Sequence, residues 1–144
     1  LHLVALVETG AEKFRELKLD KKTGSTPLLL LQLEGDLFFG VADELEACLE
    51  KIAANGVRVI IIRLKRAHNL DATVIETLVN FAIHFKANGG RLILCGLNPK
   101  MCDKLNRSRL AAVLGSENLL PTAAHTFDSV RSAIKIGKQH LEQQ

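Results

Sequence analysis

Apolar and polar residues follow one another along this chain in blocks that predict alternating strands and helices. Residues 57–64 (VRVIIIRL) are rich in β-branched side chains, and neither face of the run is polar, which predicts a strand buried on both sides. A short basic loop follows, and Asp71 then stands at the head of a helical segment. Its carboxylate suits an N-cap, because it accepts from the free amides of a first helical turn. The sequence therefore predicts a strand–loop–helix junction over residues 57–77.

The other apolar blocks complete the alternating order. Turn residues at 34–36 separate two short apolar runs, which predicts an antiparallel hairpin. Glycines mark helix ends, and Asn98 followed by Pro99 marks a helix start. The expected strands are 28–33, 37–39, 57–64, 91–95 and 119–120, and the expected helices are 41–54, 71–88, 98–115 and one from a Thr126 cap to the C-terminus.

This order predicts a single α/β domain over residues 27–144. Its central sheet is expected to be mostly parallel, with an N-terminal antiparallel hairpin and about four flanking helices. Residues 1–26 end in a turn-rich cluster, and we expect them to form a linker or peripheral arm. The chain opens on Leu1 and not on Met, so it is either processed or, as we favour, a piece of a longer protein.

Composition narrows the function classes. The chain has 144 residues, 47% of them hydrophobic and 24% charged, which is typical of globular proteins. No apolar run approaches the roughly 20 residues that span a bilayer. The net charge of +3 is too balanced to favour nucleic acid, and a chain without Trp or Tyr offers few stacking platforms for bases. We therefore expect no nucleic-acid partner.

The sequence also lacks the motifs of common active sites. It has neither a G-x-G-x-x-G fingerprint nor a P-loop, and its five histidines do not pair at metal-ligand spacing. Cys48, Cys95 and Cys102 lie far apart, which suits a reducing compartment and a packing role. We expect no catalysis, no bound metal and no cofactor.

The junction allows more than one interpretation. Asp71 is either a plain N-cap or part of a recognition surface that phosphorylation would remodel, with Thr73 as the nearest hydroxyl and Thr77 one turn further on. A third alternative is weak nucleotide binding, in which the helix amides and the loop residues Lys65, Arg66 and His68 receive phosphate. The Asp71 carboxylate argues against it, because it already occupies the cap and repels an anion.

A second candidate surface is basic. Lys100, Lys104 and Arg107 follow at i, i+4 and i+7, so they share one face of the expected third helix. Such a face suits an acidic protein partner or anionic headgroups. The alternative is an ordinary solvated helix face.

Residues 28–141, about four-fifths of the chain, resemble the STAS domain (sulfate transporter and anti-sigma factor antagonist). Three segments carry the resemblance: LLLLQLEGDLFFGVADELEACL, VRVIIIRLKRAHNLDATVIETL, and GGRLILCGLNPKMCDKL with the tail GSENLLPTAAHTFDSVRSAI. The G-D-L-F-F-G and G-S-E-N-L-L-P strings and the D-A-T triplet are more similar to the domain fused to SulP-type anion permeases than to the free antagonists.

For the antagonist branch, the resemblance implies a phosphorylated Ser or Thr directly after the junction Asp. This chain has Ala72 there, so the known switch cannot operate. Val74 also departs from the family, which often has Gly at that position. A free-standing antagonist-like protein regulated at the neighbouring Thr73 is the alternative that stays open.

For the permease branch, the resemblance implies a non-enzymatic regulatory domain on the cytoplasmic face of the cell membrane. Its implied partners are the transmembrane domain of the same polypeptide, an acidic protein such as acyl carrier protein, and a second copy in a homodimer; nucleotide binding is sometimes found in this branch. Residues 1–26 would then be the tether from the membrane domain.

Overall fold

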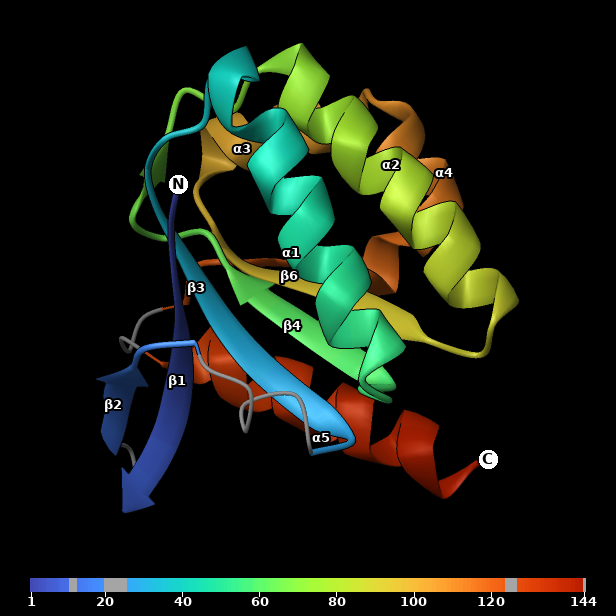
Figure 1. The fold of residues 1–144 in the computed structure, drawn as a ribbon. Helices are drawn as coiled ribbons and strands as arrows, with labels where there is room; N and C mark the ends of the chain where they lie inside the picture. The colour runs from blue at the N-terminus through green and yellow to red at the C-terminus, as the bar shows by residue number, and fades with distance from the viewer. Residues whose placement is uncertain (11–12, 20–25, 124–126, 144) are drawn as a thin grey trace.

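A seven-stranded sheet forms the centre of the molecule (Figure 1). The computed structural model describes residues 1–10, 13–19, 26–123 and 127–143. The strand order is β2-β1-β3-β4-β6-β7, with β5 paired to β3 outside this path. The strands are β1 (His2–Gly10), β2 (Lys13–Leu17), β3 (Leu28–Asp36), β4 (Val59–Arg63), β5 (Ala67–His68), β6 (Arg91–Leu97) and β7 (Leu119–Pro121).

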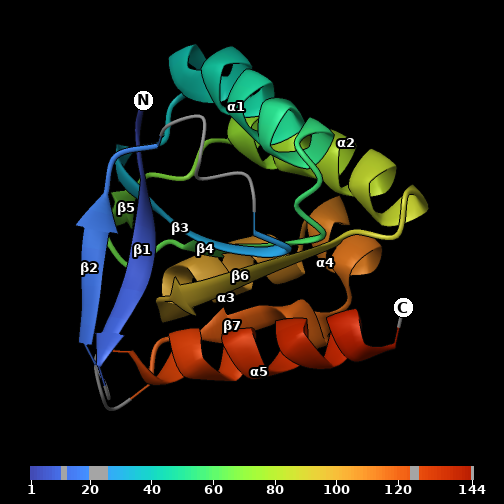
Figure 2. The same cartoon turned by 60° about the horizontal axis from the view of Figure 1, so that its bottom comes forward.

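Helices cover both faces of the sheet (Figures 1 and 2). The larger core cluster unites one sheet face with α1 (Ala42–Ala54), α2 (Ala72–Ala87), α3 (Pro99–Asn106) and α4 (Arg109–Leu114). The smaller cluster unites the other face with α5 (Asp128–Glu142). A Cβ at Gly137 would lie only 2.8 Å from Leu28 Cδ1, so glycine at this position lets α5 approach β3 closely. No helix in the described part of the chain is both long and apolar enough to cross a bilayer.

The α/β prediction is confirmed in the central strands. β4 pairs in parallel with β3 and β6, and all five of its residues are buried, as expected for a β-branched run covered on both faces. The chain moves one strand further along the sheet after each crossover, from β3 through β4 and β6 to β7. The loops after β3, β4 and β6 therefore lie together at the carboxyl ends of these parallel strands.

The expected hairpin over residues 28–39 is wrong. β3 continues without a turn to Asp36, because Gly35 and Asp36 pair in parallel with Ala67 and His68 of β5. The antiparallel hairpin consists instead of β1 and β2, and β1 also pairs antiparallel with β3. The segments His2–Gly10 and Lys13–Leu17, expected within a peripheral arm, thus supply two strands of the sheet.

The described residues form five α-helices where four were expected. The single helix expected over 98–115 is divided, because the Ser108 side chain accepts from the amide of Leu110 at 3.2 Å and starts α4 anew. The expected Thr126 cap lies outside the described residues. The described part of α5 begins after Phe127, whose side chain makes no cap hydrogen bond.

Candidate functional site at the strand–helix junction

Asp71 caps α2, as the sequence predicts. Its Oδ1 accepts from the backbone amide of Thr73 at 2.7 Å, and its backbone is extended. Its own amide donates to the carbonyl of Leu37 at 2.8 Å, which fixes the start of α2 to the end of β3. The preceding side chain, Leu70, is buried in the larger core cluster. The junction is therefore anchored on both sides of Asp71.

The loop before Asp71 is held by local hydrogen bonds. Asn69 has a φ of +50°, a left-handed conformation that Asn tolerates better than most residues. Its side-chain amide donates to Asp36 Oδ1 at 3.1 Å. The carbonyl of His68 accepts from the amide of Leu37 at 2.9 Å. These bonds order the loop against the end of β3.

Two hydroxyls near the junction differ in access. Thr73 lies exposed in the first turn of α2, next to the exposed Ala72. Thr77 is buried, and its hydroxyl donates to the carbonyl of Thr73 at 3.0 Å. Of the two hydroxyls that the sequence singles out, Thr73 is thus the accessible one.

A hollow of about 380 Å³ opens beside the junction, within the size range of ligand sites. Its lining combines loop residues such as His68 and Asp71 with the α3 cap residue Asn98 and with Lys100 and Lys104 of α3. The amine of Lys104 donates to the carbonyl of Leu70 and so connects α3 to the loop. Two candidate sites that are separate in the sequence therefore form one surface.

Other predicted basic residues lie away from this hollow. Arg107 belongs to the same expected cationic face, but its Nε donates to the carbonyl of Asp103 at 3.2 Å, and Arg107 does not line the hollow. Arg66 faces Glu16 of β2 at 3.8 Å. Lys65 lies beside Gly96 of β6. The structure thus brings His68, but neither Lys65 nor Arg66, to the junction hollow.

The sequence predicts a strand over 37–39, but the structure places two exposed phenylalanines there, beside the junction. Phe38 is 51% exposed and Phe39, at the start of the 3-10 helix η2 (Phe39–Val41), is 71% exposed. Their rings meet edge to face, with centroids 6.1 Å apart. They follow Leu37, which bonds to both His68 and Asp71, so they lie next to the junction. Gly40 directly after them was a sign in the sequence that a strand does not continue there.

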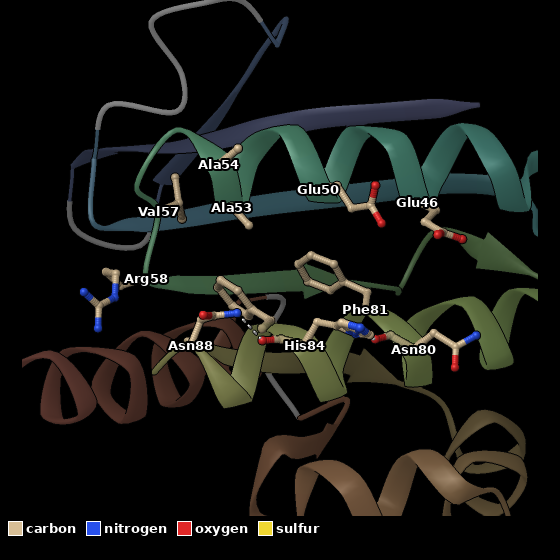
Figure 3. A pocket seen from close by; sticks show the side chains of 12 residues that line it. Glu46, Glu50, Ala53, Ala54, Val57, Arg58, Asn80, Phe81, His84 and Asn88 are labelled. Carbon is tan, nitrogen blue, oxygen red and sulfur yellow. Dashed lines mark hydrogen bonds between the residues drawn. The ribbon is translucent and has the colours of Figure 1, made fainter.

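A second, larger cavity, which no sequence pattern predicts, lies at the other end of α2 (Figure 3). It measures about 550 Å³ and lies between α1 and α2. Its floor includes Phe81 and Phe85, whose rings stack with centroids 5.1 Å apart. Glu46 and Glu50 of α1 face His84 of α2 across it (Figure 3).

Among the residues that the structure describes, no group of His, Cys, Asp and Glu is placed to hold a metal ion. Burial raises the pKa of Cys95 to about 12, although Arg63 and a hydrogen bond with Ser129 act in the opposite direction. A thiol with that pKa stays protonated near neutrality and is a poor nucleophile. Cys95 therefore has a packing role.

Comparison with known proteins decides the family. A model of the STAS domain matches residues 18–133. The chain belongs to the STAS domain family. The junction and all elements from β3 to α2 lie within the matched residues, whereas β1 and β2 precede them.

Several similar proteins carry the name of a sulfate or SulP transporter. The chain is 27% identical over 86 residues to a Bacillus subtilis (strain 168) protein named "Putative sulfate transporter YvdB", and the match covers 60% of this chain and 16% of that protein. A sulfate transporter family protein from Wolinella succinogenes is similar in structure, with a TM-score of 0.67, 28% identity and coverage of 81% of this chain and 88% of that one. The SulP transporter STAS domain from Vibrio cholerae gives a TM-score of 0.58 at 25% identity, covering 78% and 82%.

The antagonist branch shares the fold. The anti-sigma factor antagonist SpoIIAA in its unphosphorylated form gives a TM-score of 0.57 at 18% identity, covering 78% of this chain and 90% of that one. The chain is thus related to the STAS domains of SulP transporters and shares the architecture of free antagonists.

Proposed function

We propose that this chain is the non-enzymatic regulatory domain of a SulP-type anion transporter, held at the cytoplasmic face of the membrane. The observation that carries the proposal is the set of relatives: YvdB and the solved protein at 28% identity are named after sulfate transporters, and the solved domain at 25% identity belongs to a SulP transporter. Ala72 supports it further, because the junction lacks the hydroxyl that an antagonist of the known kind would carry there.

The interaction surface in this proposal is the surface around the strand–helix junction, at the carboxyl ends of the parallel strands. Phe38 and Phe39 expose apolar surface to water, and neighbouring exposed apolar side chains are typical of an interaction site. Leu1 lies close to the same surface, since its amino nitrogen is 3.3 Å from Oε2 of Glu44 in the first turn of α1. A membrane domain preceding Leu1 would thus enter beside the two phenylalanines, and it would be followed directly by β1 at the start of the folded domain.

The test uses the whole gene that encodes this chain. We expect its product, expressed in bacteria lacking their own sulfate uptake, to fractionate with membranes and to take up radiolabelled sulfate, bicarbonate or chloride. Phe38→Ser combined with Phe39→Ser should lower uptake several-fold. Ile83→Ser, at an exposed apolar residue of α2, is the matched control and should leave uptake unchanged. A product found only in the soluble fraction would contradict the proposal.

The second candidate is a free-standing antagonist regulated at Thr73. The shared fold with SpoIIAA and the exposed Thr73 in the first turn of α2 favour it. Incubation with an anti-sigma kinase and ATP, followed by intact-mass measurement, separates the two candidates. The antagonist candidate expects one added phosphate that Thr73→Ala abolishes. The transporter candidate expects none, with Ala72→Ser as the control that restores a hydroxyl at the family's position.

A further inference from the structure

A third cavity lies on the α5 side of the molecule, away from the junction. It is a groove of about 480 Å³ between the β1–β2 hairpin, β3 and α5. Figure 2 shows α5 running along one face of the sheet, with β1 and β2 at the sheet edge. The family match begins at residue 18, so one wall of this groove comes from residues outside it. The groove therefore lies partly outside the residues that the family model matches.

The walls of the groove are mostly apolar. Leu6, Leu28 and Leu30 contribute from the sheet, and Ile134 contributes from α5. Val7 and Leu17 also line it, although they remain 38% and 39% exposed. Isolated exposed apolar residues are ordinary on a protein surface, but two that line one cavity mark a surface suited to an apolar group.

The polar residues of the groove favour an anion. Lys18 and Lys138 line it from opposite sides, one following β2 and the other on α5. Neither amine makes an ion pair within the described residues. Glu8 is the one carboxylate of the lining, so the lysines give the groove a net positive charge. An apolar cavity with positive rims is complementary to a molecule that has a hydrocarbon chain and one anionic end.

We propose that this groove binds a long-chain fatty acid, with the acyl chain against Leu6, Leu28 and Ile134 and the carboxylate paired with Lys18 and Lys138. The size supports it, because 480 Å³ lies within the range of small-molecule sites. Binding would cover Val7 and Leu17 and join the hairpin to α5. This inference is independent of the proposed transporter function.

The binding experiment uses the 144-residue chain, with cis-parinaric acid as a fluorescent fatty acid and palmitate as competitor. Both fatty acids are kept below their critical micelle concentrations. The chain contains neither Trp nor Tyr, so its own fluorescence adds little background. We expect saturable binding with one site per chain and displacement by palmitate. Methyl palmitate, which has the same chain without the charge, should compete about 10-fold more weakly.

Variants locate the site. Leu17→Glu and Lys138→Glu should each weaken binding about 10-fold or more, because they place a negative charge in the groove. Ile83→Glu and Lys51→Glu are matched controls at exposed residues of α2 and α1, and should bind like the unaltered chain. Circular dichroism confirms that each variant is folded, and Lys138→Met provides a milder second variant if Lys138→Glu is not.

Three outcomes would overturn the proposal. The first is the absence of saturable binding, and the second is equal weakening by the groove and control variants. The third is binding to vesicles of phosphatidylglycerol without binding of monomeric fatty acid, which would make the surface a membrane contact and not a ligand site.

Discussion

Arg63 of β4 donates through Nη1 to the side-chain oxygen of Gln32 on β3, at a distance of 2.5 Å. The two residues are register partners on parallel strands, and both are at least 97% buried. Gln32 in turn donates to Glu34 at 2.7 Å and to Glu16 at 3.1 Å. Gln32 therefore connects the buried guanidinium group, through hydrogen bonds, to two carboxylates nearer the surface. Arg63 also stacks on the Phe127 ring, 4.5 Å from its centre.

Removing the amide at position 32 should destabilise the fold, because the guanidinium would lose a buried acceptor. We expect Gln32→Leu to lower the free energy of unfolding by about 1.5–3 kcal/mol. The double variant with Arg63→Met should lose less than the sum of the two single variants, since it removes both polar partners together. Urea denaturation of the four proteins measures this coupling, and additive losses would contradict the connection.

The N-cap of α2 makes a separate prediction. Asp71→Ala should lower the free energy of unfolding by about 1 kcal/mol, because the Thr73 amide loses its acceptor. Asp71→Asn keeps a cap oxygen and should lose at most a few tenths. A loss of equal size in both variants, measured by urea denaturation, would show that the negative charge and not the cap bond matters.

The thiol of Cys95 should be hidden in the folded protein. At pH 8, a thiol reagent should modify Cys48 and Cys102, which are partly exposed, and should reach Cys95 only after unfolding. Intact-mass measurement with and without denaturant, with Cys95→Ala as the control, counts the modified thiols. Rapid modification of Cys95 in the native protein would contradict its packing role.

The same thiol predicts a loss of stability at high pH. Burial raises the pKa of Cys95 from an ordinary 9.0 to about 12, so the unfolded thiol ionises before the folded one. Its contribution to stability is complete below pH 9 and is lost as the pH rises toward 12. Unfolding measured between pH 8 and pH 10.5 should show a smaller decline for Cys95→Ala than for the unaltered chain. Equal declines would assign the loss to other groups.

The exposed phenylalanines should matter for contacts and not for folding. Phe39→Ser should change the free energy of unfolding of the isolated domain by about 0.5 kcal/mol or less, because the side chain is 71% exposed. Thermal unfolding of the isolated domain measures this. A larger loss would mean that Phe39 stabilises the fold, and reduced uptake by Phe38 and Phe39 variants would then no longer report an interaction surface.

The central strands and the α2 cap could be predicted because their signals are local. The β-branched run that forms β4 and the Asp71 cap each need only a few neighbouring residues to be recognised. The hairpin over 28–39 was mispredicted because Gly35 and Asp36, which favour turns, pair with β5 more than thirty residues later. Partners that distant in sequence leave no local pattern.

The candidate site could be predicted only in part for the same reason. Lys104 and Leu70 are 34 residues apart, so nothing local indicates that the basic helix meets the junction loop. The groove beside α5 depends on which helix packs against which strand, because its lining brings Ile134 of α5 together with Leu6 of β1. The role of Arg63 could not be predicted, because it follows from the register of Arg63 with Gln32 on the neighbouring strand.

The measurement that tests the proposed transporter function most directly is the sequence of the coding region immediately upstream of Leu1. The proposal predicts an open reading frame that continues upstream and encodes several apolar segments of about 20 residues each. A start codon next to Leu1, with no such segments before it, would contradict the transporter function and leave Thr73 of a signalling protein as the residue to study.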